Sequence, residues 1–328
     1  MIDYRQLSKI ELHCHLDSSV RISTVAEIGK ELGLSLPDPI EAGLVAPETC
    51  VDLADYLRRI DLALEVMQQR KHLIRIAREF VEDLSADGVI YGEVRFAPQL
   101  HMREGLRLQE VVEAVNEGLA EGARATGVYV GLILCCLRHE SAESSLAIAR
   151  LAAANANSVC GIDLAGDEAR YPGTPHRAAF DLARDAGLRR TVHAGEARGA
   201  ESIQEAIEVL GAERIGHGVR IEESPKLLEY VREQAIPLEM CPLSNYQTRA
   251  VSSLAGHPID RLLRKNVCVT VSTDARTVSQ TTVTSEFERL EKLFDWGRDE
   301  FLRCQKNAAN GAFVSSAARS RLFGMLTR

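Results

Sequence analysis

The sequence has no apolar run long enough to cross a lipid bilayer. Its longest, Val128 to Leu137, is about half of the roughly 20 residues that a spanning helix needs. The first residues, Met1 to Arg5, contain no basic segment that leads into an apolar stretch, so no signal peptide is expected. We therefore expect no membrane partner and a cytoplasmic location.

Positive charge is also scarce. The chain has 39 Lys and Arg residues against 47 Asp and Glu residues, which gives a net charge of -8. The basic residues are scattered along the chain and form no block. Because nucleic-acid binding depends on clustered positive charge, nucleic acid is not an expected partner.

Cysteine spacing of the zinc-finger or redox kind is missing. The eight cysteines include no Cys-x-x-Cys pair, and most lie inside apolar segments. They are predicted to be small buried side chains, and neither disulfides nor a cysteine zinc site is expected. With 45% hydrophobic and 26% charged residues, the chain has the composition of a soluble globular protein.

Strand-like and helix-like segments alternate along the whole chain. The predicted strands lie near residues 9–15, 89–98, 129–136, 159–168, 190–196, 213–218, 236–242 and 267–274. A length of 328 residues fits two ordinary domains or one large barrel. Eight strand-then-helix units favour the second, so we predict an α/β fold, a (β/α)8 TIM barrel, as a single domain over residues 1–328.

The connection after the first strand is long. Residues 23–87 have apolar positions at helical spacing, interrupted by Gly33 and the Pro37/Pro39 pair. We predict a helical lid insertion at about residues 19–87 that covers an active site; a purely structural cap is the alternative. After the seventh strand, residues 243–245 are predicted to form an exit loop.

Several chemically active side chains fall at the ends of predicted strands. His13 and His15 are two positions apart and point the same way at the end of the first strand. The ends of parallel barrel strands share one face, and they also carry His193, His217 and Asp274. Each histidine taken alone is as compatible with a buried hydrogen bond as with a metal, but their shared location favours a metal site.

Three imidazoles and one carboxylate around an open position are typical of zinc with a bound water. We assign His13, His15, His193 and Asp274 as the ligands of one Zn²⁺ per chain. Zinc lowers the pKa of its water to about 7, which favours a hydrolytic reaction.

His217 is left without a metal role, because a fifth protein ligand would displace the water. It is expected to accept the proton of that water. Glu196 follows His193 across the turn at Gly195. This carboxyl group is expected to donate a proton to a leaving group or to a ring nitrogen.

Seven short segments resemble those of a known family. They include His-x-His-Leu-Asp at 13–17, His-Ala-Gly-Glu at 193–196 and Ser-Thr-Asp at 272–274, with further matches at 135–139, 162–168, 214–218 and 241–245. In this order and over nearly the whole chain, they resemble the adenosine deaminases, a family of amidohydrolase-type barrels.

The resemblance implies the same four zinc ligands and the same roles for two catalytic residues. Glu196 would hydrogen-bond and protonate purine N1, and His217 would activate the water. It also implies substrate contacts: Asp17 with a ribose hydroxyl, the Gly166 backbone with purine N3, and His15 and Ala275 as further substrate-binding positions. The fourth strand lacks the lysine that bridges two metals in other amidohydrolase-type barrels, so one metal is expected.

Two positions depart from the family pattern. The aspartate that usually follows the metal-binding one and meets purine N7 is Ala275 here, so that water or Arg276 would have to replace it. Ser18 occupies a position where glycine is usual.

The implied reaction is zinc-dependent deamination of adenosine or 2'-deoxyadenosine, small purine nucleosides. Deamination of adenine or of 6-aminodeoxyfutalosine is an alternative, and a non-catalytic nucleoside-binding protein is another. The sequence gives no prediction of oligomeric state.

Overall fold

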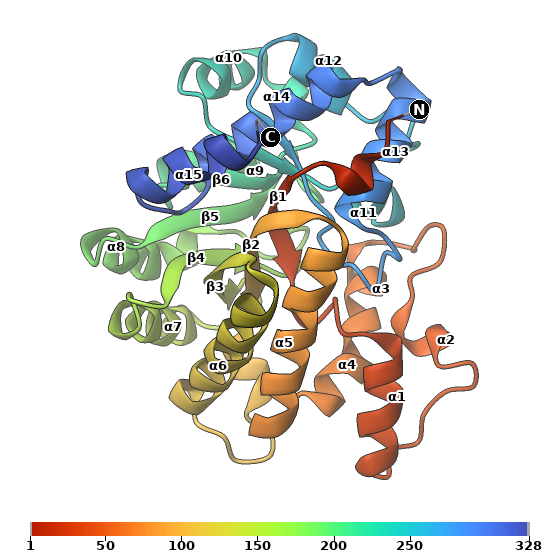
Figure 1. The fold of residues 1–328 in the computed structure, drawn as a ribbon. Coiled ribbons are helices and arrows are strands. Elements are labelled where there is room, and N and C mark those ends of the chain that lie inside the picture. The colour runs from red at the N-terminus through yellow and green to blue at the C-terminus, as the bar shows by residue number, and fades with distance from the viewer. Residues whose placement is uncertain (1, 327–328) are drawn as a thin grey trace.

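A computed structural model describes residues 2–326 (Figure 1). It contains one eight-stranded sheet in which neighbouring strands follow the chain order and all neighbours are parallel. The strands are β1 (Lys9–His15), β2 (Val89–Phe96), β3 (Tyr129–Leu137), β4 (Val159–Ala165), β5 (Arg189–Ala194), β6 (Arg214–His217), β7 (Leu238–Met240) and β8 (Val269–Val271). The predicted (β/α)8 barrel is confirmed.

The barrel closes where β1 meets the segment that follows β8. Cys14 and Asp274 form a parallel bridge. The N–H of His15 donates to the carbonyl of Asp274 at 2.7 Å, and the N–H of Asp274 donates to the carbonyl of His13 at 2.9 Å. Closure therefore brings three of the predicted metal ligands together through the backbone.

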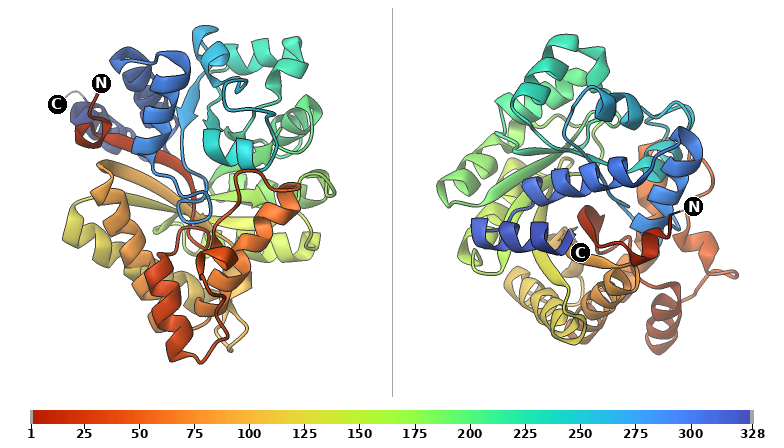
Figure 2. Two further views of the ribbon diagram at one scale, coloured as in Figure 1. Left: turned by 90° about the vertical axis from the view of Figure 1, so that its right-hand side faces the viewer. Right: turned by 45° about the horizontal axis from the view of Figure 1, so that its top comes forward.

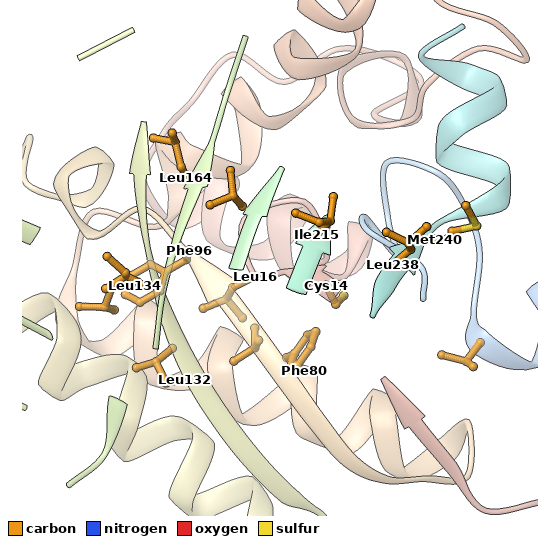
Figure 3. Packing of buried hydrophobic residues seen from close by; sticks show 14 of the residues in the cluster. Cys14, Leu16, Phe80, Phe96, Leu132, Leu134, Leu164, Ile215, Leu238 and Met240 are labelled. Carbon is orange, nitrogen blue, oxygen red and sulfur yellow. The ribbon is translucent and has the colours of Figure 1, made fainter. Parts of the chain in front are cut away.

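Helices follow every strand and surround the barrel. They are α5 (Arg70–Ala86) before β2, α6 (Leu108–Thr126), α7 (Ala142–Ala154), α8 (Arg177–Asp185), α9 (Ala200–Glu208), α10 (Pro225–Glu233), α11 (Pro242–Gln247), α12 (Ile259–Arg264) and α13 (Val283–Phe294). Short 3-10 helices are η1 (Tyr4–Gln6), η2 (Arg58–Ile60), η3 (Pro98–His101), η4 (Thr174–His176) and η5 (Ile221–Glu223). The strands need apolar side chains because both of their faces are covered. Figure 3 shows part of the resulting core, including Phe80 of α5 and Leu132 and Leu134 of β3.

The insertion after β1 holds four helices: α1 (Ile22–Glu31), α2 (Glu41–Leu44), α3 (Leu53–Leu57) and α4 (Asp61–Val66). The left view of Figure 2 shows this red-to-orange segment across one end of the barrel. Helix α5, which the predicted range 19–87 also includes, packs on β2 and α6 in the outer ring. The covering helices thus end at Val66, and we call residues 22–66 the lid.

The opposite end of the barrel is crossed by α14 (Arg298–Gly311) and α15 (Ser316–Leu326), as the right view of Figure 2 shows. Gln305 Oε1 accepts a hydrogen bond from the N–H of Ile10 at 2.6 Å, and Glu93 Oε1 accepts one from the N–H of Phe313 at 2.6 Å. These contacts leave the other end for the site. Between residues 2 and 326, no helix is both long and apolar enough to span a membrane.

Two local predictions differ from the structure. Residues 243–245 lie in α11, not in a loop, because Pro242 occupies the first helical turn, where its missing N–H leaves no intrahelical bond unmade. The cysteines were predicted to be buried, and six of the eight are, but Cys160 and Cys268 are partly exposed.

Candidate metal centre and active site

A cavity of about 380 Å³ lies between the carboxyl ends of the strands and the lid. The barrel contributes strand-end residues such as His15, His193 and Asp274. The lid contributes residues of α3 and its neighbours, including Leu53, Tyr56, Leu57 and Ile60. All of the predicted site residues except His13 therefore line one cavity.

The four predicted ligands converge at the base of this cavity. The ligand atoms of His13, His15, His193 and Asp274 all lie within 4.8 Å of one another. The Nε2 atoms of His15 and His193 are 3.1 Å apart, and Asp274 Oδ1 is 3.3 Å from His13 Nε2 and 3.5 Å from His15 Nε2. Three imidazoles and a carboxylate in this arrangement are a donor set that suits zinc.

The burial, hydrogen bonding and pKa of His13 support a role as a metal ligand. Its Nε2 atom is buried and makes no hydrogen bond of good geometry to any residue in the described part of the chain. Burial, together with nearby Arg95, lowers the pKa of His13 to about 4, so the imidazole is neutral and its lone pair is available. An unpartnered buried nitrogen that points at other ligand atoms fits a bound cation.

Carboxylates behind the histidines orient the rings. His13 Nδ1 is 2.8 Å from Glu239 Oε2, and His193 Nδ1 is 3.0 Å from Asp163 Oδ2. A carboxylate at Nδ1 holds the hydrogen there, so the Nε2 lone pair points to the centre.

Arg95 joins these two carboxylates. Its guanidinium is fully buried and lies 3.0 Å from Asp163 Oδ2 and 2.9 Å from Glu239 Oε2. Burial alone would raise the pKa of Glu239, but Arg95 and Arg214 hold it well below its usual range. None of these charged groups was assigned a role from the sequence, although charged residues within buried strands were a visible signal.

The backbone is strained at two site residues. Asp274 and His217 both have φ of 64°, in the left-handed region that residues other than glycine rarely adopt. Each such residue costs about 1–3 kcal/mol. The hydroxyl of Ser244 on α11 donates to Asp274 Oδ2 at 2.6 Å and holds the carboxylate in place.

The loop after β5 places Glu196 in the cavity. Gly195 has φ of 70°, and a Cβ atom there would lie 2.5 Å from Ile203 Cδ1. Four consecutive backbone N–H groups, from Gly195 to Arg198, donate to the buried Glu168 carboxylate at 2.6–3.2 Å. Glu168 lies within a segment matched to the family, but no role was predicted for it.

Glu196 lies in surroundings that favour its protonated form more than water does. Burial raises its pKa, and Asp274 adds to the rise, although His217 and His193 oppose it. Its Oε1 atom accepts from Thr248 Oγ1 at 3.0 Å, and its Oε2 atom is 3.6 Å from His217 Nε2. The protonated group can donate a proton into the cavity.

A chain of hydrogen bonds assigns the hydrogen of His217. The N–H of Ile259 donates to His257 Nδ1 at 3.2 Å, so His257 Nε2 carries the hydrogen and donates to Asn245 Oδ1 at 3.2 Å. Cys241 N–H donates to the same oxygen at 3.3 Å, which fixes the amide orientation. Asn245 Nδ2 therefore donates to His217 Nδ1 at 3.0 Å, and the neutral His217 ring carries its hydrogen on Nε2.

The predicted substrate-binding residues all line the cavity. These are His15, Asp17, Gly166 and Ala275, and Ser18 lies among them. Burial raises the pKa of Asp17 to about 7. Arg276 is not among the lining residues: it pairs with Glu11 at 2.9 Å and Asp87 at 3.2 Å and does not fill the space beside Ala275.

Comparisons with known proteins agree with this geometry. A family model described as "Adenosine deaminase" matches residues 8–327. The chain is 38% identical over 324 residues to an adenosine deaminase of Clostridium acetobutylicum, covering 98% of this chain and 97% of that protein. It is 41% identical over 315 residues to one of Enterococcus faecalis, covering 95% and 93%.

A solved structure of another deaminase has a similar fold. The adenine deaminase of Arthrobacter aurescens superposes with a TM-score of 0.90 at 28% identity, covering 98% of each chain. Near-complete coverage at these identities, together with the fold, shows that this chain belongs to the adenosine deaminase family of hydrolases.

Proposed function

We propose that the protein catalyses the zinc-dependent hydrolytic deamination of adenosine or 2'-deoxyadenosine to the 6-oxo nucleoside and ammonia. The observation that carries the proposal is the convergence of four ligand groups beside Glu196, in a cavity of about 380 Å³ of a chain from this family. A cavity of this size suits a purine nucleoside.

We infer that His13, His15, His193 and Asp274 hold one Zn²⁺ per chain. Bound zinc would supply a water activated near neutral pH. The imidazoles can act as neutral ligands because the carboxylates of Asp163 and Glu239 keep hydrogens on Nδ1.

Glu196 acts on the substrate ring. The protonated carboxyl group donates to purine N1, which draws electron density from C6 and makes that carbon accept a water oxygen. The new C6–O bond replaces the C6–N bond. Of the two protons that the water loses, one joins the amino group, which leaves as ammonia, and the other restores the carboxylic acid of Glu196. The raised pKa of Glu196 favours the form that can donate.

His217 holds the attacking water. Because its hydrogen lies on Nε2, the ring donates to the water oxygen and orients it toward C6. This role differs from the proton acceptor expected from the sequence, which would require the opposite tautomer.

The remaining assignments concern the nucleoside. Asp17 would meet a ribose hydroxyl and the Gly166 backbone would meet purine N3, as the family resemblance implies, and His15 is a further substrate-binding position. Ala275 forms part of the purine wall.

Ammonia release from a panel of aminopurines tests the function. Zinc-loaded protein is given adenosine, 2'-deoxyadenosine, adenine and 6-aminodeoxyfutalosine, and kcat/KM is compared. We expect the highest values for the two nucleosides. Adenine is included because an adenine deaminase has the same fold at 28% identity. Absence of turnover with every compound would reject deamination, and nucleoside binding without turnover would favour a binding protein.

A further inference from the structure

The lid places one phenol against the wall of the cavity. Tyr56 of α3 is 4% exposed and lines the cavity beside Ala275, with which it shares a small apolar cluster. Its hydroxyl is 2.6 Å from Ser279 Oγ, and Ser244 is a second hydrogen-bond neighbour. A hydroxyl that belongs to the lid thus reaches the segment that follows β8.

Other polar groups on this wall are absent or already engaged. Ala275 offers only a methyl group, and Arg276 is paired with Glu11 and Asp87. Ser18 is, with Tyr56, one of the two hydroxyl-bearing residues in the described lining, and its Oγ donates to the His15 carbonyl at 3.3 Å. The Tyr56 hydroxyl is therefore the neutral donor available beside Ala275.

The geometry of a purine assigns a partner to this donor. In the proposed reaction, C6 faces the metal centre and N1 faces Glu196, which follows β5. N7 lies on the other flank of C6 and therefore faces the wall across the barrel, where the segment after β8 carries Asp274 and Ala275. N7 is an acceptor, and a buried acceptor without a donor is costly.

We propose that the Tyr56 hydroxyl donates a hydrogen bond to purine N7, which makes Tyr56 a specificity-determining residue for substrates that carry an acceptor at this position. The inference rests on the proposed function, since the orientation of the ring follows from N1 facing Glu196.

Binding of N7 would take the phenol hydrogen from Ser244 Oγ, the acceptor within its reach in the ligand-free protein. The Ser244 hydroxyl donates to Asp274 at 2.6 Å. The Ser279 hydroxyl can donate to the phenol oxygen, because either atom of that pair can be the donor. Burial, with Asp274 nearby, raises the pKa of Tyr56 well above 10, so the phenol keeps its hydrogen.

The test compares Tyr56→Phe with wild type on adenosine and on 7-deazaadenosine, which has a carbon in place of N7. We expect kcat/KM for adenosine to fall about tenfold in the variant, and that for 7-deazaadenosine to change by less than about twofold. If 7-deazaadenosine turns over too slowly, its inhibition constant against adenosine replaces kcat/KM. An equal loss for both compounds, or no loss for either, would overturn the proposal.

Two further variants separate recognition of N7 from the hydrogen bond between Tyr56 and Ser279. Ser279→Ala removes the protein partner of the phenol but keeps the phenol, so the preference for adenosine over 7-deazaadenosine should persist. Ala275→Asp in the Tyr56→Phe background restores a polar group on the same wall and should recover part of the preference.

Failure of the proposed function gives a different result, because wild type would then release no ammonia. Calorimetric titration of both proteins with inosine and 7-deazainosine then makes the same comparison on binding alone. Equal affinities of wild type for the two ligands would reject the N7 contact.

Discussion

At the scale of single residues, Glu196 is the group whose chemistry is easiest to isolate. Glu196→Gln keeps the size of the side chain but removes the acidic hydrogen. We expect kcat to fall by about three orders of magnitude while bound zinc is unchanged, because Glu196 is not among the four converging ligands. Ammonia release and zinc content per chain are the two measurements. Near-normal turnover would exclude Glu196 as the acid.

Asn245 controls which nitrogen of His217 carries the hydrogen. Asn245→Asp has nearly the same shape but presents an acceptor where Nδ2 now donates, so it should draw the hydrogen of His217 to Nδ1. If the ring acts as a donor from Nε2, kcat should fall about 100-fold. ¹⁵N chemical shifts of His217 report the tautomer, and a shifted tautomer with normal turnover would contradict the donor role.

The sequence could predict the converging side chains but not the groups behind them. His13 and His15 were recognisable from their spacing. Their position at the same end of the barrel as the other ligands followed from the alternation of predicted strands and helices. The pairing of Asp163 and Glu239 with Arg95 depends on which strands lie across the barrel interior. Their positions in the sequence carry no signal of that pairing.

At the scale of elements, the loop after β5 depends on one carboxylate. Glu168→Gln replaces an acceptor oxygen with an NH₂ group that faces backbone N–H groups from Gly195 to Arg198. The loop should loosen, and kcat/KM should fall about tenfold or more. Zinc content should not change, since Glu168 does not touch the metal ligands' converging atoms. Loss of zinc along with activity would indicate general damage to the barrel.

The start of β1 should give a pH-dependent stability. Lys9 is buried, and its Nζ donates to the carbonyls of Tyr4 at 2.5 Å and Leu7 at 2.8 Å. Burial lowers the pKa of Lys9 from 10.5 to about 8. Between pH 8 and pH 10.5 the unfolded chain binds more protons than the folded one. The free energy of unfolding should therefore rise with pH over this range.

The rise attributable to Lys9 is up to about 3 kcal/mol across this range. Urea unfolding at pH 8 and pH 10 should show it in wild type. Lys9→Met, compared at the same two values, should lack this part of the rise; parallel curves for the two proteins would contradict the assignment.

Helices and strands were predicted best where the pattern of apolar residues extended over many positions. The eight strands followed from apolar segments between helical ones, whereas α11 was mistaken for a loop because its six residues are too few to show a period. Helix α15 was missed, and its apolar residues show little concentration on one face. The lid was expected, but its end at Val66 could not be separated from α5 by composition alone.

At the scale of the whole molecule, zinc should raise thermal stability. Binding to the folded state alone stabilises by about 4 kcal/mol when free zinc is 1,000 times its dissociation constant. Chelation should therefore lower Tm by about 5 °C or more. Differential scanning calorimetry with and without zinc makes the measurement. Asp274→Ala is the matched control and should show little response to added zinc; a full response would remove Asp274 from the ligand set.

The backbone bridge that closes the barrel gives bound zinc a second effect, on folding. The backbone joins Cys14 of β1 to Asp274 after β8, and the ligands beside this bridge come from β1, β5 and the segment after β8. An ion bound there would cross-link the first and the last strands to be synthesised. A growing chain could not complete this centre before its final strand emerged, so acquisition of the ion would mark the end of folding and not its beginning.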